Sequence, residues 1–96
     1  MQLSKYDHLL EQANAISSPG SRLLKAVEEC TELSLSLQHY LQRGGDLGHV
    51  AEEMADVLLT VRGAMLLLEL EEEVPKNLEA KAARLHERIL AGEVLI

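Results

Sequence analysis

Apolar residues recur along this chain at the three- and four-residue spacing of α-helices, and no stretch alternates as an amphipathic strand does. Both prolines and most of the six glycines lie between apolar stretches, at positions typical of helix ends. The pattern therefore predicts an all-α fold, a compact four-helix domain that covers residues 1–96. The predicted helices span about residues 3–16, 19–43, 47–72 and 75–91.

The second and third predicted helices are the most apolar part of the chain. The second carries a stripe at helical spacing that we expect to be buried: Leu23, Val27, Cys30, Ser34, Leu37 and Leu41. The third is apolar nearly all round, which is typical of a buried helix. It also contains Arg62, whose guanidinium needs an acidic partner when it is buried. We expect that partner to be Glu69 or an acid of a neighbouring subunit.

Composition narrows the class of protein. Hydrophobic residues make up 47% of only 96 residues, which indicates surplus apolar surface in so short a chain, so we expect a homodimer or homotetramer. The net charge of −7 argues against binding to a nucleic-acid backbone, which requires a basic surface. The longest apolar run, 57–68, is too short to span a bilayer. We therefore expect a cytoplasmic protein with no membrane partner.

An acidic motif occurs twice, 24 residues apart. Residues 28–32 read Glu-Glu-Cys-Thr-Glu, and residues 52–56 read Glu-Glu-Met-Ala-Asp. In each copy the second and last acids are three residues apart, so they share one helix face. Because a short Gly-Gly turn makes the two helices antiparallel neighbours, these acids can face each other. They are Glu29, Glu32, Glu53 and Asp56.

Such a convergence of carboxylates points to a cation. Four close carboxylates repel one another unless cations neutralise them, and hard oxygen ligands select Mg²⁺, with Mn²⁺ as a substitute. The alternative is a solvated acidic helix face, because glutamate is a good helix former. That alternative is weaker for Glu53 and Asp56, which lie in an apolar helix, than for the acids of 28–32.

The spacing of the two motifs resembles that of a known family. Glu28-Glu29-x-x-Glu32, twenty intervening residues, and Glu53-x-x-Asp56 before Val-Leu-Leu are similar to the signature of MazG-like nucleoside triphosphate pyrophosphohydrolases. The resemblance covers most of the chain. It implies an all-α fold and a dimer or tetramer. It also implies Mg²⁺-dependent hydrolysis of nucleoside or deoxynucleoside triphosphates to the monophosphate and pyrophosphate.

The same resemblance implies catalytic roles, residue by residue. The implied metal ligands are Glu29, Glu32, Glu53 and Asp56. Glu28 is the extra acid of the first motif, and it would orient or deprotonate the attacking water. Relatives place the nucleobase near the first helix and a face of the second helix, and the candidate contacts here are Gln12, Asn14, Tyr6 and His8. Each of these four is also an ordinary surface or packing residue of a helix.

Triphosphate binding needs cations beyond the metal, because the substrate carries more negative charge than the ion neutralises. Lys25, one turn before Glu29, is one candidate. The last helix offers Asn77, Lys81 and Arg84, which resemble the phosphate-binding set of the family. The alternative is that these side chains only balance the acids of a solvated helix face.

A second class of function also fits part of the pattern. A non-enzymatic helical module that oligomerises or binds a protein partner accounts for the surplus of aliphatic residues. It does not account for the repeated acidic motif on two apolar helices. Within the enzymes, a different substrate with a pyrophosphate bond, such as a nucleotide sugar, is a further alternative.

Overall fold

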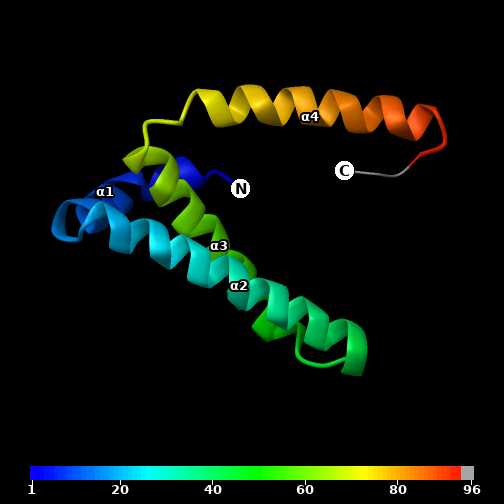
Figure 1. Ribbon diagram of the computed structural model, residues 1–96, viewed down its shortest axis with the longest axis horizontal. Coiled ribbons are helices and arrows are strands. Elements are labelled where there is room, and N and C mark those ends of the chain that lie inside the picture. The colour runs from blue at the N-terminus through cyan, green and yellow to red at the C-terminus, as the bar shows by residue number, and fades with distance from the viewer. Residues whose placement is uncertain (94–96) are drawn as a thin grey trace.

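The computed structural model describes residues 1–93 of the chain, and these form helices and turns with no strand (Figure 1). The all-α prediction is therefore confirmed. The elements are a short 3₁₀-helix, η1 (Leu3–Tyr6), and four α-helices: α1 (Asp7–Ile16), α2 (Pro19–Arg43), α3 (Leu47–Leu67) and α4 (Glu73–Leu90).

Helix caps explain why α2 and α3 begin where the sequence predicts. The Ser18 side chain accepts a hydrogen bond from the Ser21 amide, and Pro19 occupies the first helical position. Asp46 accepts from the Gly48 amide at 2.9 Å and caps α3. Between them Gly44 adopts a φ of 69°, which a residue without a side chain reaches at no steric cost. The resulting tight turn makes α2 and α3 antiparallel neighbours (Figure 1).

Helix α3 ends at Leu67, five residues before the predicted end at residue 72. Glu69 adopts a left-handed φ of 57°, and the Leu70 amide donates to the Met65 carbonyl at 2.8 Å. These are the features of a Schellman cap, usually made by glycine. The glutamate-rich run at 69–73 therefore contains a helix end as well as the start of α4, so the prediction was wrong here.

Helix α1 is attached to α3 by polar contacts rather than by a large apolar core. Arg62 donates two hydrogen bonds to the Asp7 carboxylate, at 2.9 and 2.8 Å, so its partner is not the predicted Glu69. Asn14 donates to the Gly63 carbonyl at 3.1 Å. Leu10 lies beside Gly63, where an added Cβ would come 3.6 Å from the leucine side chain. The pair of helices is thus fixed at one end of α3.

The burial of α2 differs from the prediction. The face packed against α3 contains Glu29 and Ser36, both buried. Most of the predicted buried stripe instead forms an exposed surface, here called the outer face of α2: Val27, Cys30, Ser34 and Leu41. The side chain of Val27 is 59% exposed and that of Leu41 is 84% exposed. The sequence pattern identified an apolar face but not what covers it.

Helix α4 runs apart from the α2–α3 pair (Figure 1), and none of its residues is buried. The predicted compact arrangement of four helices is therefore wrong for α4 within one chain. Its start also moves to Glu73, which leaves Pro75 in the first turn, where a missing amide hydrogen is tolerated. Among the described residues, no helix has the length and apolarity needed to cross a membrane.

Candidate metal centre

Three acids from the two motifs meet where α2 packs on α3. Glu29 from α2, with Glu53 and Asp56 from α3, each contribute a carboxylate oxygen to a group whose atoms lie within 4.8 Å of one another. We call this group the carboxylate cluster. Solvent exposure increases across the cluster from the buried Glu29 to the exposed Asp56, so one side of the cluster is open to solvent. A ligand can therefore reach the carboxylates without a rearrangement of the helices.

Glu53 has unsatisfied hydrogen-bonding capacity. Its side chain is only 13% exposed, and its Oε2 is buried with no hydrogen-bond partner among the described residues. Its Oε1 faces His49 Nε2 at 3.7 Å, which is longer than a hydrogen bond. A buried carboxylate oxygen without a partner is costly. A cation bound at the cluster would remove that cost.

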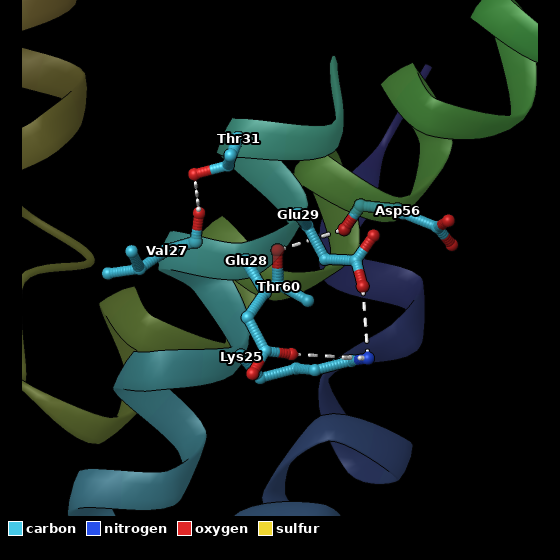
Figure 2. Close-up of polar contacts among 7 residues, drawn as sticks. All are labelled: Lys25, Val27, Glu28, Glu29, Thr31, Asp56 and Thr60. Carbon is cyan, nitrogen blue, oxygen red and sulfur yellow. Dashed lines mark hydrogen bonds and ion pairs between the residues drawn. The ribbon is translucent and has the colours of Figure 1, made fainter. Parts of the chain in front are cut away.

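Lys25 provides the nearest positive charge (Figure 2). Its Nζ lies 3.0 Å from Glu29 Oε1 and 3.9 Å from Glu28 Oε2. The hydrogen bond and the charge of Glu29 raise the pKa of Lys25 above its usual value, with smaller contributions from Glu28 and Asp56. The ammonium therefore stays protonated beside the cluster, where it partly neutralises Glu29.

The other two predicted acids lie outside the cluster. Glu28 is solvent-exposed and reaches the cluster only through Lys25 (Figure 2). Glu32 is exposed as well, one turn after Glu29, and lines a cavity beside the cluster. The structure thus brings together three of the four implied metal ligands in a single chain.

The backbone around the cluster is regular helix, and short polar side chains bond back to it. Thr60 donates to the Asp56 carbonyl at 2.9 Å, and Thr31 donates to the Val27 carbonyl at 3.0 Å (Figure 2). These bonds satisfy the hydroxyls locally. The helix register places the carboxylates, with the three-residue spacing of Glu53 and Asp56 setting their common face.

A cavity of about 430 Å³ is lined by residues of α2, of α3 and of the turn that joins them. We call it the hairpin pocket. Its lining combines one aromatic ring, aliphatic side chains, two histidines, a hydroxyl, two acids and a glycine: Tyr40, Leu35, Val50, His39, His49, Ser36, Glu32, Asp46 and Gly44. Ser36 is 8% exposed, and its Oγ has no hydrogen-bond partner within residues 1–93.

Sequence reasoning did not single out the hairpin pocket. It assigned no functional role to His49 or Ser36. A signal was present, because Ser36 is one heptad after Glu29 and His49 is one turn before Glu53. That spacing puts them on the same helix faces as the cluster.

The other predicted binding residues lie elsewhere. Asn77, Lys81 and Arg84 are exposed on α4, which runs apart from α2 and α3, so one chain does not bring them to the cluster. Asn77 donates to the Glu73 carbonyl at 3.0 Å. On α1, Asn14 bonds to Gly63 and accepts from Arg22 at 3.4 Å. Its amide therefore serves to join helices.

The remaining predicted contacts of the base lie on exposed positions near the N-terminus. Gln12 lies 3.4 Å from His8 on the surface of α1. Tyr6 has the Lys5 ammonium 5.1 Å from its ring centre and lines a groove between the N-terminal residues and α3. None of the three contacts the carboxylate cluster through a hydrogen bond or ion pair that the structure describes.

The donor set fits a hard divalent cation. Carboxylate oxygens alone suit Mg²⁺ or Mn²⁺, and Mg²⁺ keeps several waters when it binds few protein ligands. The partly exposed position of Asp56 and the unpartnered oxygen of Glu53 agree with that description.

Comparisons of the chain with models of protein families, with curated proteins and with solved structures give no match. The carboxylate geometry and the spacing of the two acidic motifs are therefore the observations that point to a function.

Proposed function

We propose that this protein hydrolyses nucleoside triphosphates to the monophosphate and pyrophosphate, with Mg²⁺ or Mn²⁺ as cofactor. The observation that carries the proposal is the carboxylate cluster, in which Glu29, Glu53 and Asp56 meet within 4.8 Å across two helices. The spacing of the motifs, which resembles that of MazG-like pyrophosphohydrolases, agrees with this function. Neither observation depends on α4.

The three cluster carboxylates would hold the divalent cation, and Glu32 follows Glu29 by about one helical turn on α2. The bound cation supplies polarisation of the phosphate oxygens and a lowered pKa of its bound water. The residues of the chain determine where that chemistry occurs, because they fix the cluster at the solvent-open side of the α2–α3 contact.

Lys25 and Glu28 complete the proposed mechanism. The Lys25 ammonium, 3.0 Å from Glu29, can donate to a phosphate oxygen and offset the charge that develops as pyrophosphate leaves. Glu28, 3.9 Å from Lys25, accepts the proton of the attacking water. The water oxygen forms the new bond to the α-phosphorus, and the bond from that phosphorus to the bridging oxygen breaks.

Product analysis tests this function. The protein is incubated with each of the eight common NTPs and dNTPs in Mg²⁺, with an EDTA control. The expected result is monophosphate plus pyrophosphate that is lost in EDTA. Diphosphate plus orthophosphate would leave a metal-dependent phosphohydrolase but contradict the proposed bond cleavage. No turnover of any nucleotide would contradict the proposal for this substrate class.

We further propose that the chain self-associates as a homodimer or homotetramer through the outer face of α2. Val27 and Leu41 are largely exposed there, and a groove lined by Ala26, Cys30 and Ser34 runs along the same face. Exposed apolar faces of this kind are typical of subunit contacts. A second copy could also bring the cations of its α4 to the cluster.

The same exposed face supports a second candidate function, a non-enzymatic helical module. Thermal melting distinguishes the two. A nucleotide added with Mg²⁺ raises the melting temperature of an enzyme with a nucleotide site. A pure oligomerisation module responds to protein concentration but not to nucleotide.

A further inference from the structure

The hairpin pocket and the carboxylate cluster lie next to each other along the contact between α2 and α3. On α2, Glu29 belongs to the cluster and Glu32, one turn later, lines the pocket. On α3, His49 lines the pocket and lies 3.7 Å from the cluster acid Glu53. A single ligand with two chemically different ends can therefore occupy both.

The charges of this surface orient such a ligand. The pocket contains the acids Glu32 and Asp46 and no lysine or arginine, so it disfavours phosphate groups. Phosphates are favoured at the cluster, where Lys25 and a divalent cation supply positive charge. The end of the ligand that enters the pocket must therefore be uncharged or cationic.

The lining of the pocket suits a planar heteroaromatic group. Tyr40, one of only two aromatic residues in the chain, lines the pocket together with the aliphatic side chains of Leu35 and Val50. His39 and His49 offer ring nitrogens that donate or accept hydrogen bonds. The volume of about 430 Å³ lies within the range of small-molecule sites.

Ser36 gives an independent indication of a ligand. It lines the pocket and is 92% buried, with an Oγ that has no partner among the described residues. A buried hydroxyl without a hydrogen bond is unusual, and a polar group of a bound ligand would satisfy it after rotation of the side chain. Along the helix axis Ser36 is about 10 Å from Glu29, so the two ends of the site are separated.

We propose that the hairpin pocket binds the nucleoside portion of the nucleotide, with the base against Tyr40 and the triphosphate at the carboxylate cluster. This inference rests on the proposed function for the identity of the ligand. It assigns base recognition to the turn between α2 and α3, rather than to Gln12, Asn14, Tyr6 and His8 near the N-terminus.

The two tyrosines supply a matched pair of variants. Tyr40→Leu removes the ring from the hairpin pocket, and Tyr6→Leu removes the ring from the N-terminal groove. Both side chains are about equally exposed, at 40% and 38%, so both variants should fold. Circular dichroism melting of each variant checks that they do.

Steady-state kinetics on these variants gives the first test. Stacking of a base on an aromatic ring predicts that Tyr40→Leu raises the KM for nucleoside triphosphates about tenfold, while Tyr6→Leu leaves it unchanged. Methyl triphosphate, which lacks a nucleoside, should be hydrolysed equally by both. An increase in KM for Tyr6→Leu alone, or for methyl triphosphate with Tyr40→Leu, overturns the assignment.

A binding experiment separates this inference from the proposed hydrolysis. Uncharged nucleosides are titrated without divalent cation into the ¹⁵N-labelled protein, and the amide shifts are followed. Shifts centred on Ser36, His39 and Tyr40, reduced in Tyr40→Leu, support the pocket even if no nucleotide is hydrolysed. Turnover without such shifts and without an effect of Tyr40→Leu keeps the hydrolase but overturns the pocket. An absence of both turnover and shifts overturns both.

Discussion

The two sides of α2 are the reverse of what polarity alone predicts, because polar side chains are buried on one side and apolar side chains are exposed on the other. The side packed on α3 buries the charged Glu29 and the hydroxyl of Ser36. The opposite side exposes Val27, Cys30 and Leu41. Burial of a carboxylate costs free energy unless it is neutralised, and so does exposure of an apolar face. The proposed cation would neutralise the carboxylates of the inner side, and the proposed subunit contact would cover the apolar residues of the outer side.

The largest expected effect comes from removing the charge of one cluster acid, which tests whether the inner side of α2 binds a cation. Asp56→Asn or Glu29→Gln should reduce Mg²⁺-dependent hydrolysis by more than about 100-fold, because direct ligands contribute at least as much as the groups that orient them. Turnover is measured with the best nucleotide from the substrate panel. Glu79→Gln, an exposed acid of α4, is the matched control and should retain activity. Near wild-type turnover in Asp56→Asn would contradict the ligand assignment.

The second prediction concerns stability with and without the cation. At a Mg²⁺ concentration about 100 times the Kd, binding contributes about 2.7 kcal/mol, which corresponds to a melting temperature about 15 °C higher for a domain of this size. EDTA should reverse this shift. Differential scanning calorimetry makes the measurement.

Glu53→Gln sharpens that prediction. Removal of one charge from the carboxylate cluster lessens its repulsion, so the variant without cation should be at least as stable as the unmodified protein. It should also lose most of the Mg²⁺-dependent shift. If Glu53→Gln unfolded more easily in EDTA and still responded fully to Mg²⁺, the role of Glu53 would be structural.

The third prediction tests the outer side of α2. Val27→Glu places a charge in the proposed subunit contact and should weaken self-association about tenfold or more, because an unpaired charge is costly to bury there. Analytical ultracentrifugation across a concentration series measures the change. Ile16→Glu is a suitable control, since Ile16 is also exposed but lies at the end of α1. An unmodified protein that stays monomeric at all concentrations would contradict the proposed contact.

The sequence predicted most of the helix boundaries and the acids of the carboxylate cluster, but not the hairpin pocket. Apolar periodicity and the positions of the prolines and glycines located α1, α2 and the start of α3, because helix-end signals and apolar spacing are local properties. The three-residue spacing of Glu53 and Asp56 likewise fixed their common face. The end of α3 was missed because a glutamate, rather than a glycine, adopts the left-handed conformation at position 69.

What the sequence did not determine is which face of each helix meets which neighbour. Both sides of α2 have helical periodicity, and only tertiary packing selects the one that contains Glu29 and Ser36. The partner of Arg62 depends on the position of α1, 55 residues away along the chain. The separation of α4 depends on the turn at 68–72, so the location of Lys81 and Arg84 was not deducible from their spacing.

The smallest predicted effect concerns the ion pair that joins α1 to α3, a region without a proposed catalytic role. The hydrogen bonds and the charge of Arg62 lower the pKa of Asp7. A carboxyl with a lowered pKa stabilises the fold at pH values above its ordinary pKa, and this contribution is lost as the pH falls through the lowered value. Asp7→Asn should therefore reduce the melting temperature near neutral pH and have little effect in strong acid.

Melting curves of Asp7→Asn and of the unmodified protein at about pH 6 and about pH 2 test this direction of the pH dependence of stability. The difference at the higher pH should not exceed about 8 °C, because partly exposed ion pairs contribute modestly, and it should nearly vanish at the lower pH. Glu11 is an exposed acid on the same helix, and Glu11→Gln should leave the melting temperature unchanged at both pH values. Hydrolysis should be unaffected in both variants, since the pair lies on α1 and the far end of α3. A loss of turnover in Asp7→Asn without a loss of stability would show that α1 contributes to the site as well as to the fold.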